Sequence, residues 1–395
     1  MKDYFADFHI HVGCSEEGQW VKIPTSRNLT PRNIFAEAAD KKGLDIIGII
    51  DALSPVVQKD LKKMVAEGLL VKSYGGGYSY DNKVIGLLGG EIETVEDNGG
   101  ISHTLLFFPD LDTIEKFSNY MNKHIRNINL SCQNAHMSLQ TLIEIASSFE
   151  AIIIPAHVFT PHKSLYGSCA NRMSHILNDF AKSKINAIEV GLSADSSMAD
   201  RISELAEYTL VSNSDAHSLH KIAREYNSVF LKEPTFEECI MAFARKGGRR
   251  VSKNYGLNPK LGKYHATHCK SCYADNVPLI EAKYCAFCKS SKITKGVFDR
   301  IEELADYTLP HHPSHRPPYI HQIPLEYIPG IGPKTLKKLL NYFDSEMNVL
   351  HYVPYETIAT VIGEPLAREI VKARSGEIII QRGSGGVYGR IIKPK

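Results

Sequence analysis

Short apolar segments alternate with amphipathic segments along the first 231 residues. The apolar segments, rich in β-branched residues, are residues 4–12, 44–50, 83–93, 102–108, 151–158, 185–192, 208–217 and 226–231. Helix-start chemistry stands between several of them, as at Thr30-Pro31, where the helical pattern that follows stops at Gly43. Strands that alternate with helices predict parallel β/α units, arranged either as a barrel or as an open doubly wound sheet.

Histidines and carboxylates stand at or just after the carboxyl ends of these predicted strands. They are His9, His11, Asp51, Glu91, Glu93, His157, Asp215 and His217. His9 and His11 are two positions apart on a strand, so both imidazoles leave the same face. Because active sites of β/α barrels gather at the carboxyl ends of the strands, we favour the barrel.

The composition is that of an ordinary globular chain. Hydrophobic residues make up 43% of the 395 residues and charged residues 23%, with a net charge of +2, so overall charge does not indicate a nucleic-acid binder. No window resembles a membrane span, and the amino terminus lacks the pattern of a secretory signal. We therefore expect a cytoplasmic protein that makes no membrane contact.

The strand-end residues are suited to metal binding. Imidazoles and carboxylates are the ligands that zinc, manganese and iron prefer, and one carboxylate can bridge two ions about 3.5–4 Å apart. Such a cluster can activate water and hold a phosphate. The alternative is that these residues are unrelated polar groups of the surface or core.

The order of these motifs resembles the polymerase and histidinol phosphatase (PHP) superfamily. Its pattern is H-x-H, a central Glu, a lone His after a strand and a closing D-x-H, and residues 3 to about 231 match it in order. The resemblance implies a distorted (β/α)7 barrel with two to three divalent ions (Zn, Mn or Mg). It implies a first ion held by His9, His11, Glu91 and Asp215, a second shared through Glu91 with His103 and His157, and a third near His217. The same resemblance implies catalytic roles for His9, His11, Glu91, His157, Asp215 and His217.

Two positions depart from the superfamily pattern. Asp51 stands where many members have a histidine after the second strand, so we expect it to act as the ligand there. The ligand that follows H-x-H falls on Glu16 or Glu17, of which we expect Glu17. Both departures concern the third ion.

Four of the eight cysteines form two C-x-x-C pairs, Cys269 with Cys272 and Cys285 with Cys288. Two such pairs twelve residues apart can enclose one tetrahedral zinc and leave no open position for a substrate. We expect a structural zinc in a segment too short for a hydrophobic core of its own, and a redox dithiol is the alternative. Lysines and aromatic residues around the pairs suit contacts with phosphates and bases, or simply a solvated face.

A glycine-rich turn precedes a lysine-rich helical pattern near the carboxyl end. Gly330, Gly332, Lys334, Thr335 and Lys337 form the turn and the helix start, where free N–H groups attract an anion. This stretch resembles a helix-hairpin-helix element that holds the DNA backbone; a turn that only packs is the alternative. The basic, glycine-rich tail from Arg382 suits backbone contacts or an unstructured end.

These observations divide the chain into residues 1–250, a PHP barrel; 251–310, a four-cysteine zinc module; and 311–395, a linker, a helix-hairpin-helix-like region and a basic tail. Because a small substrate needs only the barrel, the added parts favour DNA as the partner. This order of parts resembles the endonuclease Q family. The resemblance implies a DNA repair endonuclease that cuts 5′ to uracil, hypoxanthine, xanthine or abasic sites, alongside other repair or replication proteins.

Other functions remain open at this stage. They are a histidinol-phosphate-like phosphatase, a nuclease without lesion preference and a binding protein without catalysis. A flipped nucleotide needs a pocket. We expect the loop after His157, with Tyr166, to line it.

Overall fold

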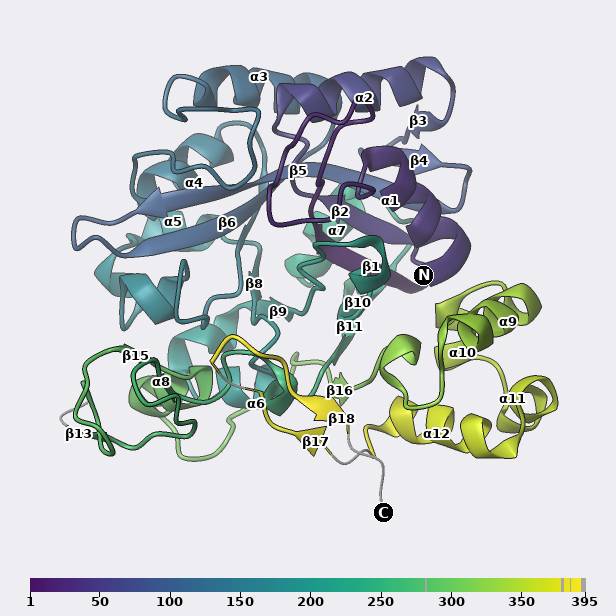
Figure 1. Cartoon of the computed structure of the whole chain (residues 1–395). Coiled ribbons are helices and arrows are strands. Elements are labelled where there is room, and N and C mark those ends of the chain that lie inside the picture. Colours follow the sequence, from purple (N-terminus) through teal and green to yellow (C-terminus); the bar gives the residue numbers. More distant parts are fainter. Residues whose placement is uncertain (281–282, 378–379, 384, 392–395) are drawn as a thin grey trace.

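The structure, a computed structural model, describes residues 1–280, 283–377, 380–383 and 385–391. Its largest part is a distorted barrel of seven strands (Figure 1). In order around the barrel they are β1 (Lys2–Ile10), β2 (Ile46–Ile49), β5 (Val84–Val95), β6 (Ile101–Phe108), β7 (Ile152–Pro155), β8 (Ala187–Glu189) and β9 (Thr209–Val211). A few hydrogen bonds join the ladders. Asn186 N–H donates to the Ile153 carbonyl, and Ile153 N–H donates to the Asn186 side chain. Ala216 N–H donates to the His9 carbonyl, and His11 N–H donates to the Ala216 carbonyl. The predicted fold class is confirmed.

Strand direction differs from the prediction at one place. β1, β2 and β5 are parallel, as are β8 and β9, but β6 is antiparallel to both β5 and β7. Only residues 96–100 connect β5 to β6, too few for the crossover that a parallel pair needs. The hairpin places His103 directly opposite Glu93 and two residues along the ladder from the position facing Glu91.

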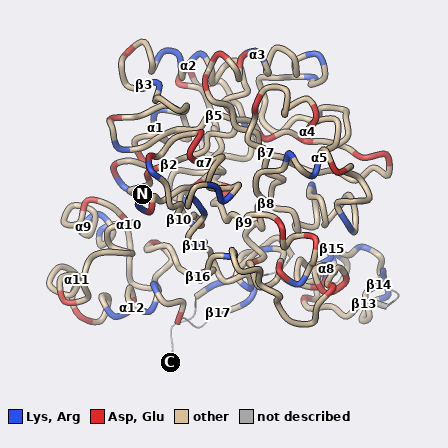
Figure 2. Tube along the Cα trace, turned by 180° about the vertical axis from the view of Figure 1, so that it is seen from behind, with Lys and Arg blue, Asp and Glu red and all other residues tan. Residues whose placement is uncertain are grey.

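Helices lie around the outside of the barrel, where acidic and basic residues are interspersed (Figure 2). They are α1 (Pro31–Glu37), α2 (Pro55–Ala66), α3 (Leu111–Met121), α4 (Leu139–Ser147), α5 (Asp179–Lys184), α6 (Ser196–Ala199) and α7 (Phe236–Phe243). Thr30 caps α1, which continues as a π-helical turn over Ala38–Lys42 and ends at Gly43 with φ of +76°. The helix predicted between Thr30 and Gly43 is confirmed. Among the described residues, each helix is too short or too polar to cross a bilayer.

Further strands extend the barrel sheet at both ends. β3 (Leu70–Lys72) and β4 (Tyr78–Tyr80) continue it beyond β5, and β10 (Tyr226–Leu231), β11 (Arg250–Gly256) and β16 (Tyr319–His321) continue it beyond β1. The proposed boundary at residue 250 therefore falls on the first residue of β11. The proline-rich connector is extended, as predicted, and supplies β16.

The cysteine-rich segment is built from two short ladders and a helix. The ladders pair β12 (His268–Cys269) with β15 (Ile293–Thr294), and β13 (Leu279–Ile280) with β14 (Tyr284–Cys285). Helix α8 (Val297–Leu304) docks the segment on the barrel, where Arg300 donates to the Tyr166 carbonyl (2.7 Å).

A helical region follows in the sequence, and the chain ends in a hairpin. In space the hairpin lies between the helical region and the cysteine-rich segment (Figure 1). The elements of the helical region are α9 (Pro333–Phe343), α10 (Glu346–His351), α11 (Tyr355–Ile362) and α12 (Glu364–Ser375), and the hairpin pairs β17 (Ile380–Gln381) with β18 (Arg390–Ile391). A buried ion pair joins Lys42 to Glu346 (2.8 Å), and His351 stacks on Phe5, so the region packs on the barrel. Within the predicted basic tail, residues 384 and 392–395 lie outside the described residues.

Candidate metal centre

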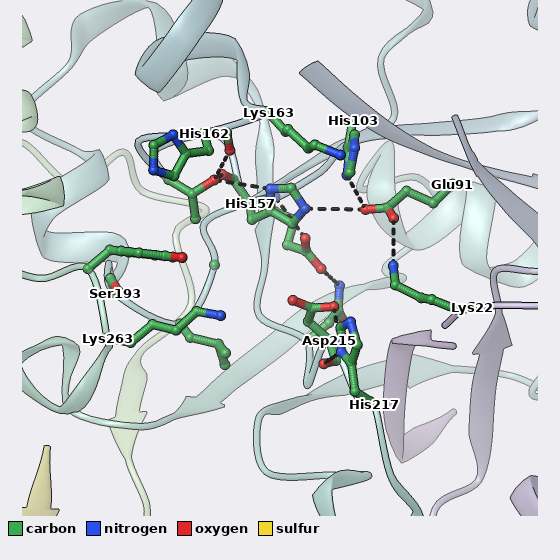
Figure 3. A pocket seen from close by; sticks show the side chains of 16 residues that line it. Lys22, Glu91, His103, His157, His162, Lys163, Ser193, Asp215, His217 and Lys263 are labelled. Carbon is green, nitrogen blue, oxygen red and sulfur yellow. Dashed lines mark hydrogen bonds and ion pairs between the residues drawn. The ribbon is translucent and has the colours of Figure 1, made fainter. Parts of the chain in front are cut away.

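Five of the seven barrel strands, β1, β5, β6, β7 and β9, or the loops after them, deliver polar side chains to one point at the end of the barrel. Glu91, in the middle of β5, contacts His103, His157 and Lys22 (Figure 3). The members that the sequence predicted and the structure brings together are His9, His11, Glu91, His103, His157, Asp215 and His217.

Four donors form a first set. His9 Nε2 lies 3.6 Å from Glu91 Oε1 and 3.5 Å from Asp215 Oδ1, and His11 Nε2 lies 3.7 Å from Glu91 Oε2 and 3.4 Å from Asp215 Oδ1. Metal–ligand distances of about 2.0–2.2 Å place neighbouring donors of a tetrahedron about 3.3–3.6 Å apart. His9 Nε2 is buried without a hydrogen-bond partner among the described residues. The set therefore fits one divalent ion.

A second set shares Glu91 with the first. Glu91 Oε1 lies 2.9 Å from His103 Nδ1 and 3.2 Å from His157 Nε2, while Oε2 faces His11. Glu91 therefore contacts donors of both sets, and a shared carboxylate of this kind can bridge two ions. The β5–β6 hairpin creates this set, because it folds His103 back beside Glu91.

The charges around the centre lower the pKa of its carboxylates and favour their ionised form. Burial would raise the pKa of Asp215, but His9, His11 and His217 outweigh it and hold that pKa well below its ordinary value. Burial opposes ionisation of Glu91 in the same way, and His103 and Lys22 hold its pKa well below the usual range. Buried carboxylates of this kind are paired with positive groups or bind metal ions.

Two carboxylates stand behind the donors and orient them. The Nδ1 of His9 lies 3.0 Å from Glu189 Oε1, and the Nδ1 of His11 lies 3.0 Å from Asp51 Oδ2, which leaves each Nε2 directed at the centre. Asp51 also accepts from Val12 N–H (2.7 Å). The prediction that Asp51 is a ligand is therefore corrected, since its carboxylate is engaged by His11 and the backbone. Sequence reasoning missed Glu189, although it ends β8.

The structure does not bring Glu17 to the centre. Its side chain is 70% exposed and pairs with Lys59 at 2.7 Å, and the alternative, Glu16, is also exposed. His217 is close, with its ring 4.7 Å from that of His11, and its Nδ1 lies 2.9 Å from the Asp215 carbonyl. The donors predicted for a third ion thus do not converge.

A cavity of about 220 Å³ opens over the centre. Lys22, Lys163 and Lys263 line it together with the ligand candidates, so its wall combines metal donors with three positive charges (Figure 3). Tyr166, expected in a pocket wall, is instead fully buried and donates to Glu204 (2.8 Å). That expectation is wrong because the π-helical turn Leu165–Cys169 directs the tyrosine into the core.

The four paired cysteines converge as a separate site. Cys269 Sγ lies 3.5 Å from Cys288 Sγ, and Cys272 Sγ lies 3.7 Å from Cys285 Sγ. A zinc with sulfur ligands at about 2.3 Å places its sulfurs about 3.8 Å apart, whereas a disulfide needs about 2.05 Å. Backbone N–H groups of Cys272 and Ser271 lower the pKa of the Cys269 thiol to about 6. The donor set fits a four-thiolate zinc.

The predicted DNA-contacting turn lies at the start of α9. Gly330 has φ of +101°, and Gly330, Gly332, Lys334 and Lys337 are exposed while Thr335 is half-buried. A single 3₁₀ turn, Leu325–Tyr327, stands before the glycines in place of a full first helix. The contact with DNA stays a prediction.

The barrel, the bridged donor sets and the basic cavity define a metal-dependent hydrolase. No family model matches the chain. It is 42% identical over 393 residues to the uncharacterized protein YqxK of Bacillus subtilis, covering 99% of this chain and 100% of that one. It resembles two solved structures at 34% identity over its whole length. One is the lesion-specific endonuclease PfuEndoQ from Pyrococcus furiosus (TM-score 0.82, 96% of that chain), and the other is endonuclease Q with a 27-mer duplex and an abasic lesion at the active site (TM-score 0.84, 97%).

The chain belongs to the endonuclease Q family. The sequence-based predictions of this family and of a metal-dependent nuclease are confirmed.

Proposed function

We propose that this chain is a DNA repair endonuclease that hydrolyses the phosphodiester bond 5′ to deaminated bases (uracil, hypoxanthine, xanthine) or to abasic sites. The observation that carries the proposal is the pair of donor sets bridged by Glu91 beneath a basic cavity. The solved relative with an abasic lesion at its active site supports the same assignment.

Different residues of the site would bind the metal ions, attract the DNA backbone and accept a proton. The two donor sets would hold divalent ions, which when bound would lower the pKa of water and neutralise charge on the phosphate. Lys163 and Lys263, at the edge of the cavity, attract the negatively charged backbone on either side of the scissile bond. The Nδ1 of His217 is held at the Asp215 carbonyl, which leaves its Nε2 as a proton acceptor on the cavity side.

A cleft of about 820 Å³ continues from the metal centre between the zinc module and the carboxyl-terminal hairpin. Its wall is shared with the first cavity at His162 and Tyr264. Its basic and aromatic residues are Tyr264, His268, Lys270, Tyr273, Arg382, Tyr388 and Arg390. Such a mixture suits phosphates and unstacked bases, so we assign the cleft to the strand that adjoins the lesion.

The hairpin that closes this cleft is also tied to the metal centre. Arg224 donates to the Tyr388 hydroxyl (3.3 Å) and to the Asp215 carbonyl (3.1 Å). Backbone hydrogen bonds hold the hairpin to residues 260–263, including Gly386 N–H to the Lys263 carbonyl (3.0 Å). We propose that residues 251–310 form the zinc module that braces the cleft, and that the turn at Gly330–Lys337 holds the duplex backbone farther away.

The test is a comparison of duplexes that carry uracil, hypoxanthine, xanthine, an abasic site or no lesion. We expect a metal-dependent nick 5′ to each lesion and intact undamaged DNA. Equal cutting of all duplexes would refute lesion selectivity. Intact DNA with phosphate release from histidinol phosphate would make the chain a phosphatase. The Lys270→Gln, Arg382→Gln double variant should weaken DNA binding and reduce the salt slope by about 2, because each phosphate contact contributes about 0.9.

A further inference from the structure

Arg224 is a buried arginine beside the metal centre. The residue is 7% exposed, and its Nε donates to the Ser214 carbonyl (2.6 Å) while one terminal nitrogen donates to the Asp215 carbonyl (3.1 Å). The other terminal nitrogen donates to the hydroxyl of Tyr388 on the carboxyl-terminal hairpin (3.3 Å). Among the described residues, these hydrogen-bond partners are all uncharged groups. Because a charge taken out of water depends on such partners, each of the three bonds helps to fix the guanidinium.

The two carbonyls belong to the segment that carries a donor of the first set. Asp215 has φ of +45°, in the left-handed region that a residue with a side chain rarely adopts. Asp7, on β1, joins this segment to that of Arg224, because its carboxylate accepts from Ser214 N–H (3.0 Å) and from Ala223 N–H (3.0 Å). Arg224 therefore helps to hold the strained backbone that presents the Asp215 carboxylate to the first donor set.

Tyr388 lies between the cleft and this arginine. It is 38% exposed and forms part of the wall of the cleft of about 820 Å³. Two cations lie against its ring, with Arg224 Cζ 5.5 Å and Lys263 Nζ 5.7 Å from the ring centre, which is within the range of a cation–π contact. Lys263 also lines the cavity over the metal centre. One aromatic ring thus contacts the cleft, a lysine of the cavity and the arginine that holds the ligand segment.

The hairpin that carries Tyr388 is small. Its strands β17 and β18 pair over two residues each, and the N–H groups of Gly383, Gly386 and Gly389 donate to carbonyls of residues 260–263. A nucleic-acid strand in the cleft would stack on Tyr388 and add contacts to the docked position of the hairpin. Such a strand therefore favours the arrangement in which the Tyr388 hydroxyl reaches Arg224.

We infer that Tyr388, acting through Arg224, couples the binding of a DNA strand in the cleft to the binding of divalent ions at the metal centre, so that each ligand tightens the other. Tyr388 and Arg224 are then positioning residues for the reaction. Coupling between two binding sites is reciprocal, so it can be measured from the side of the ion. The inference rests on the proposed function, which supplies both the strand and the ions.

Binding measurements on the full chain test the coupling without catalysis. Protein depleted of barrel metal is titrated with Mn²⁺ by calorimetry, alone and with a saturating oligothymidine that carries no lesion, and a titration of the oligothymidine by itself is subtracted. The ratio of the two Mn²⁺ affinities is the coupling factor. Tyr388→Phe removes the hydroxyl that reaches Arg224 and leaves any direct contact between ion and phosphate, so we expect the factor to fall about fivefold. An unchanged factor would overturn the inference.

Tyr273→Phe is the matched control. Tyr273 lines the same cleft, and within the described part of the chain no hydrogen bond joins it to Arg224 or Asp215. This variant should keep the wild-type coupling factor. A fall equal to that of Tyr388→Phe would overturn the inference, because any tyrosine of the cleft would then have the same effect.

Arg224→Lys tests whether Tyr388 acts through the arginine. A lysine keeps the charge but lacks the planar fork that reaches two carbonyls and a hydroxyl together. Arg224→Lys and the double variant with Tyr388→Phe should therefore share one reduced coupling factor, and a further fall in the double variant would refute a route through Arg224. Thermal unfolding checks each variant; if Arg224→Lys does not fold, the comparison of Tyr388→Phe with Tyr273→Phe decides alone.

The outcome for the coupling is separate from that for the proposed function. A reduced factor in Tyr388→Phe, in a chain that leaves lesion DNA intact, would refute the proposed function but not the coupling. Equal factors in a chain that nicks lesion DNA would refute the coupling alone. Failure of the oligothymidine to bind would refute both the coupling and the assignment of the cleft to a DNA strand.

Discussion

Glu189→Gln tests whether the carboxylates behind the donors tune the metal centre. The side chain is 1% exposed and accepts from His9 Nδ1–H (3.0 Å), His157 N–H (2.8 Å) and Asn213 Nδ2–H (2.7 Å). A glutamine must turn its NH₂ group toward at least one of these donors. Loss of such a partner lowers metal affinity about 10–100-fold, equivalent to about 1.4–2.7 kcal/mol.

The assay is Mn²⁺ titration of metal-depleted protein by calorimetry, with thermal unfolding measured in parallel. Glu204→Gln is the matched control, because Glu204 also accepts from a buried hydroxyl and a backbone N–H, those of Tyr166 (2.8 Å) and Met173 (3.0 Å), but does not touch the centre. Both variants should lose stability, since each leaves a donor unpaired. Equal Mn²⁺ affinity in the two variants would refute the orienting role of Glu189.

Three further predictions concern activity, zinc and pH. Asp215→Asn removes a donor of the first set, so the turnover number for lesion cutting should fall on the order of 10³-fold. The affinity for DNA, measured by fluorescence anisotropy, should stay within about threefold. An equal loss of turnover and of DNA affinity would argue against Asp215 as a metal ligand. Cys269→Ser should abolish zinc binding and make residues 265–295 susceptible to proteolysis, because the hydrophobic cluster of this segment is very small. An unchanged zinc content and an unchanged thermal unfolding temperature would contradict a structural zinc site. Burial, opposed by Ser212, raises the pKa of Glu225 from 4.5 to about 8. The folded state therefore binds this proton more tightly, and the free energy of unfolding falls by a few kcal/mol as pH rises from about 4.5 to about 8. In the Glu225→Gln variant the urea midpoint of unfolding should depend less on pH over this range. The same pH dependence in the variant and the wild-type protein would show that Glu225 is not its source.

The strand ends and the ligand types were readable from the sequence because they depend on local patterns. An apolar segment followed by His or Asp marks a barrel strand and its carboxyl end, and this places His9, Asp215 and their neighbours correctly. The two C-x-x-C pairs have a spacing that predicts their convergence in the same way.

The roles of Asp51, Glu17 and Lys22 were not readable, because each depends on packing between distant segments. Asp51 follows the second strand, where the superfamily pattern has a ligand, yet its carboxylate accepts a hydrogen bond from Val12 N–H. Glu17 is drawn to Lys59 on α2, and Lys22 enters only because the hairpin from Gly13 folds against Ser131. The antiparallel β6 strand follows from a five-residue connection that the alternating pattern does not reveal.

The most direct test of the central claim is cutting of an end-labelled abasic duplex by metal-depleted protein before and after Mn²⁺ is added. The account predicts no product without metal and, after addition, a single nick immediately 5′ to the lesion, with none on the undamaged duplex. Cutting without metal, or equal cutting of undamaged DNA, would contradict it.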